Sequence, residues 1–244
     1  ANASTEGVAK LLPSAAGELM HKELGVLSRL LEAPEKPFKV ILGGAKVSDK
    51  LGVIESLLGL ADELLVGGAM AYTFIRAQGG AVGDSLVETE RLDDARRILA
   101  RAEERGVRLL LPEDSVCARA LAADAPTEVF PSDAIPAGYR GLDIGPAAAS
   151  SYRDRLRDAK TVFWNGPMGV FETPPFDRGT RAVAEAVADI EGFTVVGGGD
   201  SVAAVNALGL GGAIDHISTG GGASLEFLEG ATLPGLAALE RSTG

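Results

Sequence analysis

The stretch FKVILGGAKVSDK, residues 38–50, decides the fold of this chain. Its first five residues, 38–42, are mostly large and apolar, which predicts a short buried strand. Two glycines end the strand, and the residues after them open a predicted helix. A strand that passes through a glycine turn into a helix is typical of a βαβ unit, in which the next strand runs parallel to the first.

The same succession repeats along the chain. Helical stretches of about 8 to 20 residues fit between most of the strand candidates. This alternation predicts an α/β fold, a Rossmann-like three-layer domain with an about six-stranded parallel sheet that helices cover on both faces. Beyond 38–42, the predicted strands are 63–66, 107–111, 161–164, 193–196 and 216–217.

An amphipathic helix is predicted before the first strand, over residues 14–31. Met20, Leu24, Leu27 and Leu31 fall on one stripe at helical spacing. Pro34 then provides a stop signal.

The composition limits the classes of function. The 244 residues carry 23 Lys and Arg against 34 Asp and Glu, a formal net charge of −11. This balance argues against general binding of nucleic acid or anionic membranes, so any anionic ligand must bind at a local site. The single cysteine, Cys117, excludes an internal disulfide and fits a reducing compartment. His21 and His216 lie far apart in the sequence, which argues against a metal cluster.

The sequence also predicts where in the cell the protein is located. No apolar run approaches the ~20 residues that span a bilayer, and no leader pattern opens the sequence, so we predict a cytoplasmic protein.

Glycines gather after four predicted strands, at 43–44, 67–68, 197–199 and 220–222. Any one cluster is as well explained by a tight turn, but the four together favour a ligand site at the carboxyl edge of the sheet.

Three segments at this edge carry candidate chemistry. Lys46 and Lys50 lie four residues apart in a predicted helix, where they could bracket a polyphosphate or simply face solvent. Asp200 follows a glycine cluster at a predicted helix start, where an anion and Mg²⁺ would fit, although it could instead be an N-cap. The loop at 164–172 is unusually apolar, and a base-binding loop or a buried turn would explain it equally well.

Six motifs together resemble one family. They are LGGAKVSDK (42–50), LLVGGAMAYTF (64–74), IPAGYRGLDIGP (135–146), VFWNGPMGVFE (162–172), VVGGGDS (195–201) and HISTGGGASLEFLEG (216–230). Their wording and order resemble the signatures of phosphoglycerate kinases, in the carboxy-terminal half that binds nucleotide. The resemblance implies an amino-terminal segment and linker-type helix over 1–33 and a nucleotide-binding domain over 34–244. It also implies ATP/ADP and Mg²⁺ as cofactors in reversible phosphoryl transfer between ATP and 3-phosphoglycerate.

The resemblance assigns roles residue by residue. Lys46 would contact the transferring phosphoryl group, with Gly198 and Gly221 also at the catalytic centre, and Lys50 would hold the α-phosphate. Thr219, Gly220 and Gly221 would begin a helix that faces this group. Gly198, Gly199 and Ser201 would cradle the β-phosphate, Asn165 would lie near the phosphates, and Asp200 would bind Mg²⁺. Glu172 would bind the ribose. The remaining nucleotide-binding residues implied are Gly44, Ala45, Gly68, Ala69, Leu121, Gly141, Leu142, Pro167 and Val170.

The sequence also departs from the family pattern. Ala69 stands where a third glycine is common, Ser201 replaces the commoner threonine, and Glu18 replaces an aromatic residue. The family's amino-terminal half, which binds 3-phosphoglycerate, is missing. We therefore predict that the chain binds adenine nucleotide but lacks turnover alone. We also predict a monomer. The alternative is a non-catalytic adenine-nucleotide-binding module.

Overall fold

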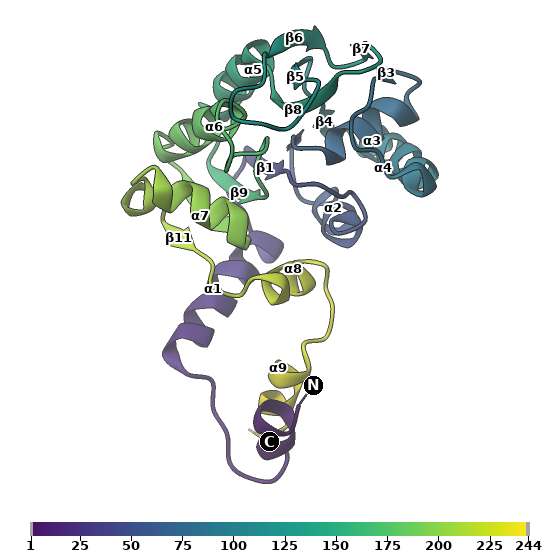
Figure 1. The fold of residues 1–244 in the computed structure, drawn as a ribbon. Helices are drawn as coiled ribbons and strands as arrows, with labels where there is room; N and C mark the ends of the chain where they lie inside the picture. The colour runs from purple at the N-terminus through teal and green to yellow at the C-terminus, as the bar shows by residue number, and fades with distance from the viewer. Residues whose placement is uncertain (1, 243–244) are drawn as a thin grey trace.

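A six-stranded sheet forms the centre of the molecule in a computed structural model that describes residues 2–242 (Figure 1). All its strands run parallel, in the order β11-β10-β9-β1-β2-β4. This arrangement confirms the predicted α/β class and the predicted six-stranded sheet. The strands are β1 (Phe38–Leu42), β2 (Glu63–Val66), β4 (Arg108–Leu110), β9 (Thr161–Asn165), β10 (Phe193–Gly197) and β11 (His216–Ile217).

The strand order reverses at β1. The chain moves outward from β1 to β2 and β4, and then returns to the other side of β1 to form β9, β10 and β11. Loops that leave neighbouring strands β1 and β9 therefore pass to opposite faces of the sheet and leave a crevice at its carboxyl edge, where open α/β folds bind ligands.

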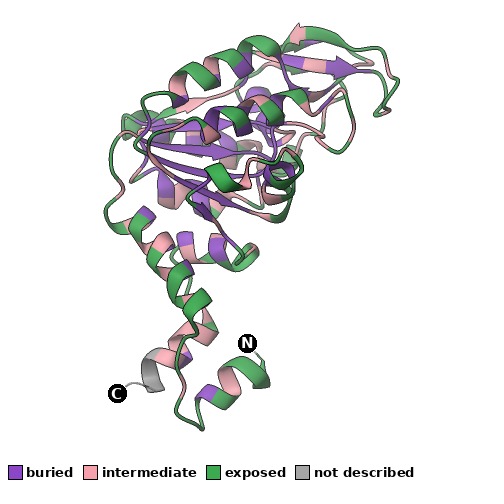
Figure 2. Cartoon of the chain, turned by 90° about the vertical axis from the view of Figure 1, so that its left-hand side faces the viewer, coloured by how far each residue is buried: buried purple, intermediate pink, exposed green. Residues whose placement is uncertain are grey.

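Apolar side chains alternate along the strands and form a core on each face of the sheet (Figure 2). In β1, Val40 and Leu42 pack on one face and Ile41 on the other. The first face is covered by α2 (Leu51–Leu57), α3 (Met70–Ala77) and α4 (Leu92–Glu104). The second is covered by α5 (Pro146–Leu156), α6 (Arg178–Ala188) and α7 (Gly199–Ala207).

Two small sheets lie beside the main one and were not predicted. One is antiparallel, with β5 (Asp114–Ala118) between β6 (Glu128–Pro131) and β8 (Arg140–Ile144). The other pairs β3 (Ala81–Val82) with β7 (Ala134–Ile135). These strands are short, and β6 is largely exposed, so they lack the apolar runs that indicate a strand in the sequence.

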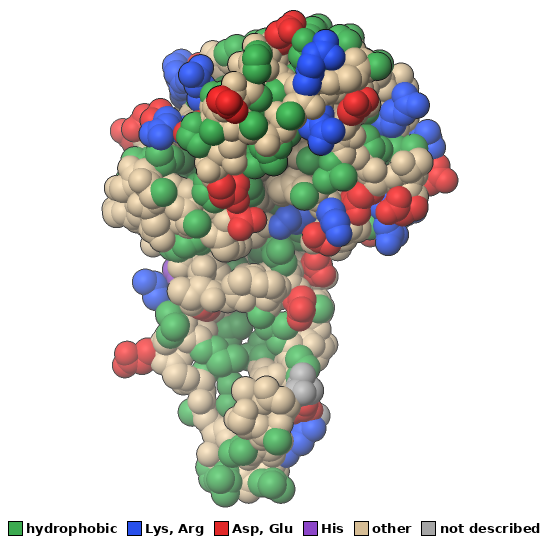
Figure 3. All heavy atoms as spheres, in the orientation of Figure 1, with side chains coloured by type: hydrophobic (Ala, Val, Ile, Leu, Met, Phe, Trp, Pro, Cys, Tyr) green, Lys and Arg blue, Asp and Glu red, His purple; other side chains and the backbone are tan. Residues whose placement is uncertain are grey.

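A narrow stalk extends from the sheet (Figures 1 and 3). It contains α1 (Glu18–Glu32), the π-helix η1 (Ala3–Gly7), α8 (Gly222–Leu228) next to α1, and α9 (Pro234–Ser242) next to η1. Two single turns, η2 (Thr89–Arg91) and η3 (Gly211–Ala213), complete the described elements. The predicted boundary between 1–33 and 34–244 stays a prediction, and the outer ends of both ranges lie outside the described residues.

The predicted helix over 14–31 is confirmed as α1, but it begins later, at Glu18 after an extended Gly17. Its buried stripe also differs from the predicted one, because Leu27 and Leu30 are buried together with Glu23, whereas Leu24 is only half-buried. Glu18 lies in the first turn, where a carboxylate interacts favourably with the helix dipole, which explains why an acid is tolerated there.

None of the helices described over residues 2–242 is long and apolar enough to cross a membrane.

Candidate functional site

Two of the four predicted glycine clusters, 43–44 and 67–68, meet the loop that follows β9 at the carboxyl edge of the sheet. The N–H of Gly43 donates to the carbonyl of Asn165 at 2.9 Å, and that of Gly44 donates to the carbonyl of Pro167 at 3.0 Å. Gly68 has a φ of 65°. A Cβ added at Gly68 would lie 2.5 Å from the backbone of Gly44. Side chains at Gly43 and Gly68 would force the loops apart.

A first cavity of about 480 Å³ opens between these loops and the β5–β6–β8 sheet. It is bounded mainly by backbone and apolar side chains, with Glu172 exposed at its margin. Leu121 and Leu86, which are 50% and 54% exposed, also line it. Of the predicted residues, this cavity brings together Gly44, Ala45, Gly68, Ala69, Leu121, Gly141, Leu142, Pro167, Val170 and Glu172.

A second cavity of about 300 Å³ adjoins the first. The two share Gly44, Ala45, Pro167 and Asp200, so a single elongated molecule could occupy both. Thr219 and Gly220 are not among the lining residues of either. The second cavity brings together the remaining predicted residues, Lys46, Lys50, Asn165, Gly198, Gly199, Ser201 and Gly221.

Lys46 and Lys50 line the second cavity, but the prediction that they share a helical face is wrong. Residues 48–50 form a turn, and α2 begins only at Leu51. The Lys50 ammonium donates to Oδ1 of the buried Asn165. Burial lowers the pKa of Lys50, and the nearby carboxylates of Asp49, Asp200 and Glu229 oppose this shift. A partly desolvated ammonium ion of this kind would gain from an anionic ligand.

Asp200 is the second residue of α7, so the alternative that it is an N-cap is wrong. The N-cap is Gly198, which has a φ of 86° and, as a glycine, has no side chain to cap the helix. Asp200 is exposed and belongs to the lining of both cavities. The hydroxyl of Ser201 is buried and accepts the N–H of Gly166 at 2.5 Å. Ser201 therefore also ties α7 to the loop that follows β9.

Gly221 is the N-cap of α8 and has a φ of 54°. The predicted helix start is thus shifted, because α8 begins at Gly222 and the residues at 219–221 precede it. The carboxylate of Glu23 on α1 holds this segment, since it accepts the N–H of Thr219 at 2.8 Å and the hydroxyl of Ser218 at 2.9 Å.

The apolar loop at 164–172 is both a buried turn and a cavity wall. Trp164 is fully buried, and its Nε1 donates to the carbonyl of Gly166 at 2.8 Å. The N–H of Met168 donates to Oγ1 of Thr180 at 3.0 Å, and that of Val170 donates to the carbonyl of Leu142 at 2.9 Å. The loop is therefore fixed from both sides.

Several cavity residues escaped prediction. Asp143 is buried in a position that raises its pKa to about 8, although it accepts the N–H groups of Gly179 and Ile144 at 2.7 and 2.9 Å. Its place in the 135–146 motif was the available signal. Tyr72 gave no signal, because it stands in an apolar helix. A Cβ at Gly141 would lie 1.8 Å from the Tyr72 hydroxyl, which explains the glycine there.

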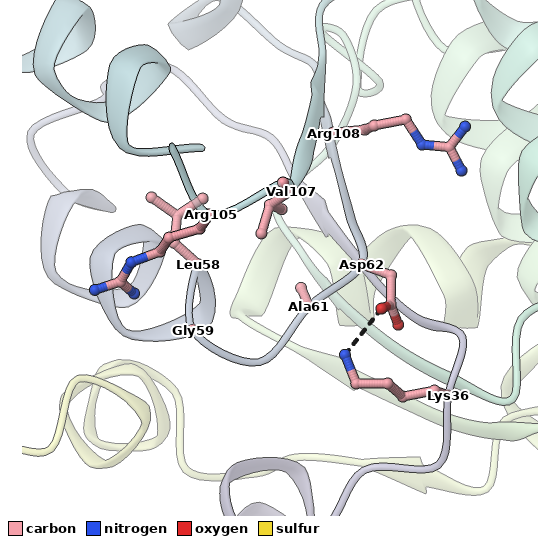
Figure 4. A pocket seen from close by; sticks show the side chains of 9 residues that line it. Lys36, Leu58, Gly59, Ala61, Asp62, Arg105, Val107 and Arg108 are labelled. Carbon is pink, nitrogen blue, oxygen red and sulfur yellow. Dashed lines mark hydrogen bonds and ion pairs between the residues drawn. The ribbon is translucent and has the colours of Figure 1, made fainter. Parts of the chain in front are cut away.

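A wider hollow of about 590 Å³ lies at the opposite, amino edge of the sheet (Figure 4). Lys36 pairs with Asp62 at 2.8 Å, while the side chains of Arg105 and Arg108 point away from this pair in different directions. No predicted site residue lines this hollow.

The chain matches the model of the phosphoglycerate kinase family over residues 1–231. It is 64% identical to a phosphoglycerate kinase of Thermus thermophilus over 241 residues. The aligned region covers 98% of this chain and 62% of that protein. The chain is 57% identical over 239 residues to one of Herpetosiphon aurantiacus, covering 98% and 61%.

Solved structures show the same relationship. The phosphoglycerate kinase of Coxiella burnetii matches with a TM-score of 0.95 and 43% identity, over 100% of this chain and 64% of that one. The enzyme of Pyrococcus horikoshii matches with a TM-score of 0.86 and 36% identity, over 98% and 60%. The chain thus spans less than two thirds of the length of these relatives.

Proposed function

This chain belongs to the phosphoglycerate kinase family, and on that premise we propose that it is the nucleotide-binding part of such an enzyme. It binds Mg-ATP or Mg-ADP, and in the complete polypeptide it supports reversible phosphoryl transfer between ATP and 3-phosphoglycerate. One observation carries the proposal. An apolar cavity and a cavity with lysines and glycine N–H groups adjoin at the carboxyl edge of a parallel sheet. A base and a polyphosphate require this succession of environments.

The apolar cavity would accept the adenine ring. Val170 and Pro167 form one wall, and Leu121 and Leu86 lie at the rim, where they would exclude water from the ring faces. The exposed carboxylate of Glu172 would accept hydrogen bonds from the ribose hydroxyls.

The second cavity would hold the phosphates. Lys50, already partly desolvated, would pair with a phosphate present in both ATP and ADP, whereas the exposed Lys46 would reach the group that moves. The first N–H groups of α7 lack partners within the helix and suit phosphate oxygens. Phosphoryl transfer needs positioning and charge stabilisation more than a nucleophilic side chain.

The residues at the second cavity also fit Mg²⁺. The ion takes one or two carboxylates together with phosphate oxygens and water, and Asp200 presents one exposed carboxylate beside the proposed phosphates. When bound there, Mg²⁺ would neutralise charge on the phosphate oxygens. Asp200 would hold it in place.

We further propose that the chain alone does not turn over. An acceptor with a carboxylate and a phosphate needs unpaired cations, but the arginines on α4 pair with acids nearby, as Arg97 does with Asp94 at 2.7 Å and Arg101 with Glu55 at 3.1 Å. The acceptor site would then lie in the part of the family's length that this chain does not span. A monomeric state and a cytoplasmic location stay predictions.

A calorimetric titration of the 244-residue chain with ADP, with and without Mg²⁺, tests nucleotide binding. ADP at a hundredfold excess over its dissociation constant should stabilise the fold by about 2.7 kcal/mol, because it binds only the folded state. An unmoved melting curve at saturating ADP would falsify the proposal.

A coupled assay distinguishes an enzyme from a non-catalytic nucleotide-binding module. The module is the second candidate because the chain spans only part of the length of its relatives. The complete polypeptide should turn over 3-phosphoglycerate, and the present chain should not. If the complete polypeptide binds ADP yet shows no transfer, the module is the better description.

A further inference from the structure

We propose that Glu88 is a positioning residue that fixes residues 46–50, here called the lysine turn, to the rim of the first, apolar cavity, here called the base cavity. This inference rests on the proposed function, since it assigns Glu88 a part in placing Lys46 for phosphoryl transfer. Glu88 lies between β3 and η2 and lines neither cavity itself.

The carboxylate of Glu88 holds the middle of the lysine turn. Its Oε2 accepts the N–H of Ser48 at 3.0 Å, and its Oε1 accepts the Ser48 hydroxyl at 2.6 Å. Ser48 stands midway between the two lysines. The N-cap of α2, Lys50, makes no side-chain cap. Glu88, 40 residues further along the chain, therefore satisfies backbone N–H groups that the chain entering α2 leaves without partners.

The backbone of Glu88 is tied to the other side of the site. Its N–H donates to Oγ1 of Thr73 at 3.1 Å, and Thr73 is buried on α3, the helix that follows Gly68 and Ala69 of the base cavity. Leu86, two residues before Glu88, lines the same cavity. One short segment, 86–88, thus touches the base cavity at one end and the lysine turn at the other.

The charge of Glu88 is part of this arrangement. Burial would raise its pKa, but hydrogen bonds from Ser48 and Val47 and the positive charge of Lys46 together hold the pKa below its usual range. Glu88 is therefore ionised and offers acceptors only, which matches the donors that it meets. A glutamine in its place has one acceptor oxygen and an amide that would oppose one of those donors.

The expected consequence is catalytic rather than structural. Lys46 reaches the second cavity from a turn that belongs to no helix, so its position depends on what holds that turn. A displacement of about 1 Å can cost on the order of a hundredfold in rate. Base binding, which uses Leu86 and the far walls, should suffer much less. Lys50 should also keep its place, because its ammonium donates to Asn165 on another loop.

The test is steady-state kinetics on the complete polypeptide with Glu88→Gln, Glu88→Asp and Glu90→Gln. Glu90→Gln is the matched control, because it removes the same charge two residues away at an exposed side chain. We expect Glu88→Gln to lower kcat by roughly a hundredfold with little change in KM for ADP. Glu88→Asp, which keeps both acceptor oxygens, should recover part of the loss, and the control should match the unmodified enzyme.

Amide hydrogen exchange on the 244-residue chain gives a second readout that needs no activity. Exchange at Ser48 should accelerate in Glu88→Gln and stay unchanged in Glu90→Gln, while the strands of the main sheet keep their protection. The inference is overturned if kcat is unaffected, if kcat and KM change together with a general loss of protection, or if Glu90→Gln has the same effect. An unmodified protein that neither binds ADP nor transfers phosphoryl would instead overturn the proposed function.

Discussion

The two edges of the main sheet differ in how their polar groups are arranged. At the carboxyl edge, glycine loops bring backbone N–H groups, Lys46 and Asp200 to adjoining cavities. Charged side chains also gather at the amino edge, but most of them pair with one another. Lys36 pairs with Asp62 at 2.8 Å, and the buried Glu63 meets Arg108, Arg155 and the buried Lys39, the last at 3.7 Å.

The difference shows what distinguishes a ligand site from a charged hollow. The hollow at the amino edge has a volume of about 590 Å³, larger than that of either cavity at the carboxyl edge, and three cations line it. Its cations do not converge, however, and Lys36 and Arg108 already have carboxylate partners (Figure 4). Charges that are already neutralised gain little from an anion, so the direction and pairing of the charges decide, not their number.

We expect the largest effect from a substitution at the amino edge. Glu63→Ala removes the buried acid that Lys39, Arg108 and Arg155 share. It leaves the buried Lys39 with the exposed Asp158 as its carboxylate partner, which should cost up to about 3–5 kcal/mol of the free energy of unfolding. Denaturant unfolding measures this loss. ADP affinity, measured where the variant is still folded, should stay unchanged, and a parallel loss of affinity would show that the two edges are coupled.

We expect the second-largest effect from a substitution at the carboxyl edge, where it should lower kcat. Lys46→Ala in the complete polypeptide should lower kcat by about 10²–10³-fold, as the loss of one group that stabilises transition-state charge does elsewhere. Arg105→Ala at the amino edge also removes the charge of an exposed side chain and serves as the control. Similar losses in the two variants would mean that general electrostatics, not the position of Lys46, supports transfer.

A smaller effect concerns binding. Lys50→Ala should weaken ADP affinity by about tenfold, because it removes a charge-assisted contact. Burial lowers the pKa of Lys50, so the free site loses its charge at a lower pH than an ordinary lysine would as the pH rises. Calorimetry at increasing alkaline pH should therefore show an early fall in affinity. Lys50→Arg should remove this fall, and an unchanged profile would contradict the assignment.

The smallest effect on stability is expected at Asp200. Asp200→Ala removes an exposed acid from the first turn of α7, which should change the free energy of unfolding by no more than about 1 kcal/mol. Removal of Mg²⁺ by a chelator should weaken ADP binding to the unmodified chain and hardly affect the variant. A variant that melts far lower would favour a structural role for this carboxylate.

The sequence predicted the parts of the molecule that repeat a pattern. All six strands of the main sheet were predicted. Five lie in apolar or leucine-rich runs, a signature of parallel strands covered by helices, whereas the two-residue β11 was indicated by the glycine cluster that follows it. The small sheets were missed, since their strands are two to five residues long and partly exposed. Pairing with a distant segment, rather than local preference, makes them strands.

The candidate site was predictable where backbone geometry demands a particular residue. The glycine clusters predicted a site at the carboxyl edge, where both cavities lie, and at Gly43, Gly67 and Gly68 close contact between loops excludes a side chain. Contacts between distant segments had no sequence signal. The carboxylate of Glu88 reaches Ser48, and Asp143 reaches the start of α6, so neither could be inferred from spacing along the chain. For the same reason the lysine turn was wrongly predicted as helix.

Trp164 is the only tryptophan of the chain, and it is fully buried at the end of β9, with its indole N–H bonded inside the loop that walls both cavities. Its fluorescence therefore comes from one defined place. An emission maximum at short wavelength would mark a closed loop, and a shift to the red would mark water entering beneath it. The protein thus carries an optical probe at its ligand edge and needs no added dye.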